Sequence, residues 1–89
     1  MKKNDIVTVI TLAGEVVGKY AGDSTDGTVT LEDPRMLVQN EHGIGFAHGV
    51  CVTGENNPTS IKFQQYVFVT PTGETYEKAY RQATSGLVL

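Results

Sequence analysis

The chain has 89 residues, with ten acidic and seven basic side chains and a formal net charge of −3, and this length predicts one small domain with a thin core. The negative balance argues against a general binder of the phosphate backbone, which carries a basic surface. Cys51 is the single cysteine, so no internal disulfide is possible. No apolar run approaches the roughly 20 residues of a membrane span, and we expect a soluble, cytoplasmic protein.

The first part of the chain predicts two strands joined by a tight turn. Residues 5–12 are rich in β-branched side chains, which suit a pleated surface. Gly14 can take the positive φ that a short hairpin connection requires. A second strand is expected over 15–21, where Gly18 has no side chain to pack and indicates a bulge or a bend. The two strands therefore predict a curled antiparallel sheet.

The middle of the chain predicts three more strands, separated by turn signals. Alternation of polar and apolar residues favours a strand over 27–38, with Pro34 at an edge, a bulge or a bend because it cannot donate to a ladder. A further strand is expected over 45–53, after a polar loop. The turn-rich segment 54–59 then leads into the last strand, at 61–69.

The end of the chain predicts one helix, over 73–84, with Thr72 as its N-cap. Apolar residues at helical spacing form one stripe: Tyr76, Ala79, Tyr80 and Ala83. Two charge pairs at i, i+4 lie on the opposite side: Glu74 with Lys78, and Glu77 with Arg81. We expect Gly86 to cap the helix and the apolar tail 87–89 to pack against the sheet.

Apolar side chains on both faces of the late strands indicate contact between copies of the chain. A domain this small cannot cover both faces with its own residues. The residues expected at a subunit interface are Val50, Val52, Tyr66, Val67 and Phe68. The predicted partner is therefore the chain itself.

Three segments carry a resemblance to a known family. Residues 9–19 are similar to the hydrophobic strand, glycine turn and bent glycine-containing strand of the first Sm motif, and residues 28–34 resemble the third strand of that motif with its acidic exit. Residues 80–89 resemble the helix and tail of phage-type proteins. The chain thus resembles the Sm-like family, and more narrowly the small Sm-like proteins of cyanophage type, which would place it in the host cytoplasm if a phage encodes it.

The resemblance implies a mainly β fold over residues 1–89: a strongly bent five-stranded antiparallel sheet, forming a small open barrel, with one C-terminal helix. It implies a cyclic homo-oligomer of about five to seven subunits, in which the fourth strand of one subunit pairs with the fifth strand of the next and satisfies both sheet edges.

The same resemblance implies a non-enzymatic role, with single-stranded RNA as a second partner. The positions that align best with the RNA-contacting loop of the family are Asp26, Gly27 and Thr28. RNA-binding members also present an Arg-Gly pair between strands four and five, where this chain has Gly54 followed by Glu55. The alternative is a phage-type protein-interaction or assembly scaffold that has lost the standard RNA site.

Other candidate contacts to nucleic acid come from aromatic and basic residues. Bases could stack on four aromatic side chains, Tyr20, Phe46, Tyr66 and Phe68. Three cations could meet phosphates, Lys19, Arg35 and Lys62. Aromatic residues on strands are more often part of a core or an interface, and this second reading is favoured for each of them.

Metal binding and catalysis find little support in the sequence. His48 and Cys51 lie three residues apart, which on a strand places them on opposite faces, and zinc needs about four ligands. The acidic residues around Asp26 lack the spacing of a calcium loop. No nucleophile motif, phosphate-binding loop or paired-carboxylate arrangement occurs. We expect no enzyme activity, no metal and no cofactor.

Overall fold

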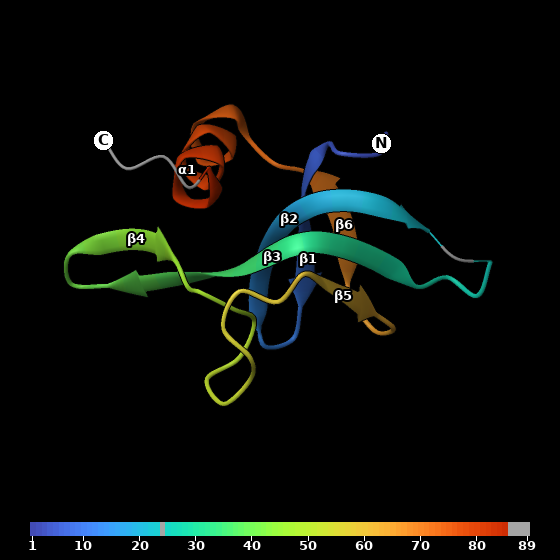
Figure 1. The fold of residues 1–89 in the computed structure, drawn as a ribbon, viewed down its shortest axis with the longest axis horizontal. Coiled ribbons are helices and arrows are strands. Elements are labelled where there is room, and N and C mark those ends of the chain that lie inside the picture. Colours follow the sequence, from blue (N-terminus) through green and yellow to red (C-terminus); the bar gives the residue numbers. More distant parts are fainter. Residues whose placement is uncertain (24, 86–89) are drawn as a thin grey trace.

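The computed structural model describes residues 1–23 and 25–85. It is mainly β, with one bent, unclosed antiparallel sheet and a helix at the end of the described chain (Figure 1). The elements in chain order are β1 (Ile6–Thr11), β2 (Gly14–Asp23), β3 (Val29–Asn40), β4 (Gly43–Phe46), β5 (Ser60–Phe63), β6 (Phe68–Pro71) and α1 (Glu74–Thr84). No described helix is long and apolar enough to cross a membrane.

The strands follow the order β4-β3-β2-β1-β6, and β5 pairs with β3 outside this path. The long strand β3 joins the parts of the sheet, because its first residues lie between β2 and β5 while its last residues pair with β4. In Figure 1 the hairpin of β3 and β4 projects away from the remaining strands. β4 and β6 therefore end this path, and β5 is a further terminal strand beside β3.

A bulge bends the sheet where β2 crosses β3. Lys19 pairs with Glu32 and Val17 pairs with Arg35, so the pairing shifts its register around Gly18. A Cβ atom on Gly18 would lie 3.0 Å from the Leu31 Cβ atom and 3.1 Å from the Glu32 carbonyl oxygen. The bend predicted from Gly18 is confirmed, because only a residue without a side chain allows β3 to approach this closely.

Beside this bulge, the bend in β3 falls at Asp33 and Pro34. Asp33 has a φ of 49°, in the left-handed region, and Pro34 is buried. Proline has no N–H to donate to a ladder and therefore suits a bulge. The prediction for Pro34 is confirmed.

The main core lies on one face of the sheet. Alternate residues of the strands point to it, as the period of two requires, and its buried members are Val7, Val9, Val16, Tyr20, Val29 and Leu31. Four partly buried residues pack against them: Val50, Phe63, Tyr66 and Val69. The opposite face carries a smaller cluster under α1, formed by Ile6, Val17 and Tyr80 with Phe46.

The prediction of five strands was wrong at the last two. The expected strand 45–53 is present only as β4, which ends at Phe46, because the glycines, asparagines and proline after it form a long loop whose backbone bonds reach other segments. The expected strand 61–69 is split into β5 and β6. Residues 64–67 turn the chain, so that β5 pairs with β3 while β6 pairs with β1.

The helix begins one residue later than predicted, with Gly73 as the N-cap and no side-chain capping bond. Thr72 is not the cap, because its hydroxyl group lies 2.8 Å from the Thr8 hydroxyl group and its N–H donates to the Ile6 carbonyl oxygen. Both predicted charge pairs of the helix are present, at 3.3 and 3.1 Å. Of the predicted apolar stripe only Tyr80 is buried. The predicted cap Gly86 and tail 87–89 lie outside the described residues.

Candidate interaction surfaces

The loop between β2 and β3 brings together the three residues predicted to contact RNA. The Asp26 carboxylate accepts hydrogen bonds from the Thr28 N–H at 3.2 Å and from the Thr28 hydroxyl group at 2.9 Å. The Gly27 carbonyl oxygen accepts a 2.8 Å bond from the Tyr66 hydroxyl group. All three residues precede β3, which begins at Val29 instead of the predicted residue 27. Gly27 has a φ of 85°, outside the strand region.

Hydrogen bonding within this loop stabilises the charged form of Asp26. The Thr28 hydroxyl and amide groups lower the pKa of the Asp26 carboxyl group below its usual 3.8, and the nearby Lys62 adds a smaller effect in the same direction. The carboxylate is exposed, while Thr28 is buried. The loop is therefore ordered by its own polar groups.

Replacing Asp26 by Asn should change how the stability depends on pH. Because the folded state lowers the pKa of this carboxyl group, its stabilising contribution is complete above the usual aspartate pKa of 3.8 and is lost as the pH falls through the lower folded value. We expect the melting temperatures of the wild type and Asp26→Asn to differ most near pH 6 and to converge as the pH falls through the lowered folded pKa of Asp26. Thermal unfolding from pH 2.5 to 7 measures this. A constant difference over that range would contradict the assignment.

Two of the other predicted nucleic-acid contacts have structural roles. Tyr20 is buried in the main core. The Arg35 side chain is also buried, with its Nε atom 3.3 Å from an Asp33 carboxylate oxygen. A core role was the favoured interpretation for Tyr20, whereas Arg35 was a candidate for phosphate contact, and it follows the bend in β3. Arg35 shares the face of its partner Val17, beneath the helix.

The remaining aromatic and basic candidates differ in how far their side chains are exposed to solvent. Phe46 packs edge to face against Tyr80, with the ring centroids 5.8 Å apart. Lys19 is half-buried, Lys62 is exposed, and the Phe68 side chain is 51% exposed. Among the four aromatic candidates, Phe68 alone presents most of its ring to solvent.

The five predicted interface residues divide into two groups. Val50 and Tyr66 pack against the main core. Val52, Val67 and Phe68 are exposed, at 102%, 58% and 51% of their surface. Val52 lies in the loop after β4 instead of in a strand. The exposed members are free to meet another molecule, whereas the packed members contribute to the fold of a single chain.

The face of the sheet next to the start of α1 carries an apolar groove with a volume of about 460 Å³. It crosses most of the sheet, because its lining comes from β1, β2, β3, β4, β6 and α1. Its most exposed apolar members are Ile44, Phe68 and Tyr76. Phe68 was predicted to lie in an interface, while Ile44 was missed because it stands between two glycines and belongs to no apolar run.

A second hollow, of about 400 Å³, lies at the tip of the hairpin of β1 and β2. Leu12 is fully exposed there, and Val67, which lies in the turn before β6, also lines this hollow. The neighbour of Val67 in the chain, Phe68, lines the apolar groove. An edge strand with apolar hollows beside it is unusual for a protein that works as a single copy.

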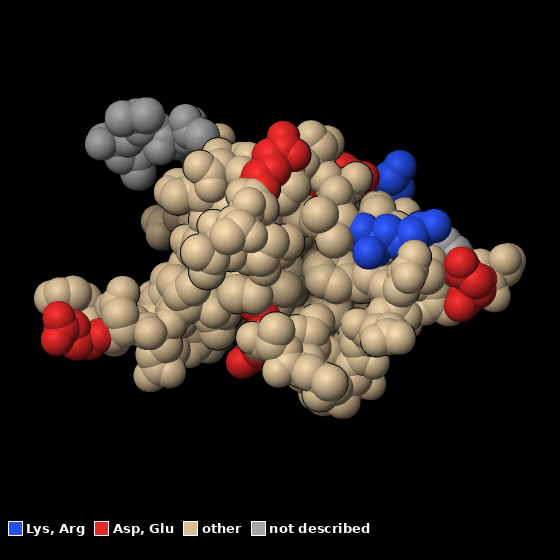
Figure 2. Space-filling model, turned by 90° about the horizontal axis from the view of Figure 1, so that it is seen from below, with Lys and Arg blue, Asp and Glu red and all other residues tan. Residues whose placement is uncertain are grey.

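Charged side chains are sparse on the face drawn in Figure 2, where uncharged residues predominate. Among the described residues, no group of three or more His, Cys, Asp or Glu side chains is placed to hold a metal ion. His48 and Cys51 are both exposed in the loop after β4. The face drawn in Figure 2 is therefore mostly uncharged.

Comparisons with protein-family models, with curated proteins and with solved structures find no match for this chain.

Proposed function

We propose that this chain is a non-enzymatic Sm-like subunit that assembles with copies of itself into a cyclic homo-oligomer of about five to seven subunits. One observation carries the proposal: the strand order ends in β4 on one side and β6 on the other, and exposed apolar side chains lie at both. An edge strand offers unpaired backbone groups that favour pairing with another chain. Pairing the β4 edge of one subunit with the β6 edge of the next would satisfy both.

A contact between two different edges of the same molecule is head to tail, and such contacts close into rings when the rotation between subunits permits. Pro71 limits the pairing along β6, because proline has no N–H to donate. Apolar burial must then supply most of the stabilisation. Phe68 and Ile44, which lie on the two end strands, are placed to provide it.

We propose that the assembled ring acts as a scaffold for protein interaction. The loop polar groups that would contact RNA already form hydrogen bonds with each other or with Tyr66, and the chain carries three more acidic than basic residues. RNA binding is the second candidate, favoured by the exposed Asp26 and Gly27 with Lys62 close by. In that case Asp26, Gly27 and Thr28 would contact the bases.

Two measurements test these proposals. The mass of the purified protein in solution, determined by light scattering at micromolar concentration, should correspond to five to seven subunits. A single-subunit mass would refute the ring. Titration with labelled oligo-U, oligo-A and single-stranded DNA, at low and moderate salt, then decides between the two roles. Binding that weakens with added salt would favour the RNA role, and no binding even at low salt would remove it.

A further inference from the structure

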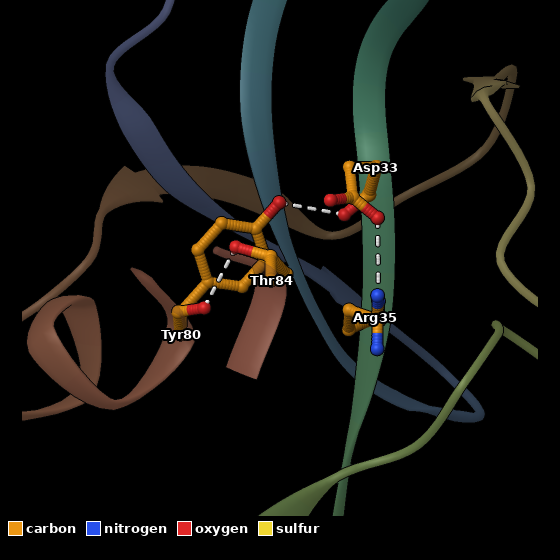
Figure 3. A network of polar contacts seen from close by, with 4 residues as sticks. All are labelled: Asp33, Arg35, Tyr80 and Thr84. Carbon is orange, nitrogen blue, oxygen red and sulfur yellow. Dashed lines mark hydrogen bonds and ion pairs between the residues drawn. The ribbon is translucent and has the colours of Figure 1, made fainter. Parts of the chain in front are cut away.

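Tyr80 is the one buried residue among those described in α1, and it attaches the helix to the sheet. Tyr80 is fully buried and packs with Ile6 and Val17, while the Phe46 ring meets it edge to face. Its hydroxyl group donates a 2.6 Å hydrogen bond to the Asp33 carbonyl oxygen, at the bend of β3 (Figure 3). Burial is the largest cause that raises the pKa of this hydroxyl group. Tyr80 is therefore held as a neutral, fully packed anchor.

Among the remaining described residues of α1, none is buried, and Tyr76 lines the apolar groove together with residues of the strands. Each of them is exposed or half-buried, and the two ion pairs join helix residues to other helix residues. The Thr84 hydroxyl group also bonds within the helix, to the Tyr80 carbonyl oxygen (Figure 3). A helix of 11 residues is marginal in water without tertiary packing. Its order therefore depends on the Tyr80 anchor.

The joint between the sheet and α1 is a single glycine. Thr72 belongs to the sheet, through its bonds to Ile6 and Thr8. Gly73 follows, exposed and without a side-chain capping bond, and the helix starts at the next residue. A glycine at this position leaves the backbone free to turn, because it has no Cβ atom.

From these contacts we infer that α1 is a hinged flap, which closes over the sheet through Tyr80 and opens at Gly73 without unfolding the strands. Opening exposes Ile6, Val17 and Phe46. Val17 also lines the apolar groove, so the open flap joins the groove to the newly exposed cluster and enlarges the apolar face. The inference does not depend on ring formation, because both the anchor and the joint lie within one chain.

The main core is separate from this motion. It lies on the opposite face of the sheet, and Tyr80 is not one of its members. Among the described contacts, opening the flap releases the Tyr80 side chain and its hydrogen bond to Asp33, while global unfolding exposes the whole core. Local openings of this kind occur more often than global unfolding and can be detected by amide hydrogen exchange.

Native-state hydrogen exchange of the whole protein at low denaturant concentrations tests the flap. The α1 amides should exchange at least about tenfold faster than the β1 and β2 amides, with a rate almost independent of denaturant. The Tyr80→Phe variant keeps the ring and removes the bond to Asp33, so α1 exchange should rise roughly fivefold with little change in the sheet.

Tyr76→Phe is the matched control, because it removes a hydroxyl group from the same helix at a side chain that is 43% exposed. We expect its α1 exchange to equal that of the wild type. The flap is refuted if the exchange rates of the α1 amides and of the strand amides depend on denaturant concentration in the same way. It is also refuted if Tyr80→Phe accelerates both regions equally, because the anchor would then stabilise only the whole fold.

Discussion

Phe68→Asp is expected to dissociate the proposed oligomer into single subunits. Phe68 lies on the end strand β6 and lines the apolar groove, so the ring model places it in contact with the next subunit. A carboxylate without a partner in such a contact costs several kcal/mol, which exceeds what a short edge pairing can offset. Light scattering after size-exclusion chromatography measures the change in mass. The neighbouring Val67→Asp should act in the same direction.

The fold of the subunit should survive Phe68→Asp, because half of that side chain is already exposed in the single chain. Its circular dichroism spectrum should therefore match that of the wild type. Asn56→Asp is the matched control, since it adds the same charge to an exposed loop away from the groove. If Phe68→Asp keeps the full assembly at micromolar concentration, Phe68 does not lie in the interface.

The early part of the fold could be predicted because local sequence determines it. The hairpin at Gly14, the bulge at Gly18 and the bend at Pro34 each follow from the backbone preference of one residue. The helix was predicted to within one residue at its start, since its charge pairs and its periodicity lie within the helix itself. In these segments the local preferences agree with the tertiary structure.

The later strands could not be predicted in the same way. Residues 61–69 were predicted as one strand with apolar residues on both faces, yet Phe63 ends β5 and Phe68 begins β6. The two strands are separate because β5 pairs with β3 while β6 pairs with β1. This division is a tertiary effect, and the local sequence does not predict it. Arg35 is a similar case. From the sequence alone, a basic residue on a strand is expected to face solvent, but the bend places Arg35 beside Asp33.

The loop site at residues 26–28 stays a prediction. Asp26, Gly27 and Thr28 lie together because they are neighbours in one loop, and Asp26 and Thr28 are joined by hydrogen bonds. Their bond to Tyr66, 39 residues beyond Gly27, depends on how the turn before β6 returns to the loop. The apolar groove draws its lining from five strands and the helix start. Such a surface becomes visible only when the strand order is known.

The close approach of β3 to Gly18 leads to the second prediction of a large effect. Gly18→Val should destabilise the subunit by about 1 to 3 kcal/mol, because an added side chain would meet the Leu31 Cβ atom and the Glu32 carbonyl oxygen at 3.0 and 3.1 Å. For a domain of this size, each kcal/mol lowers the melting temperature by roughly 4 to 8 °C. Thermal unfolding followed by circular dichroism measures the loss.

Gly45→Val provides the matched control for this substitution. Gly45 also lies in a strand, but nothing stands within 4 Å of an added Cβ atom, and its φ is not in the left-handed region. Valine suits a strand better than glycine, so we expect the melting temperature to stay the same or to rise. Equal destabilisation by the two variants would show that any added side chain in these strands destabilises the subunit, whatever its position. A loss confined to Gly18→Val would locate the constraint at the bulge, where the sheet bends around its core.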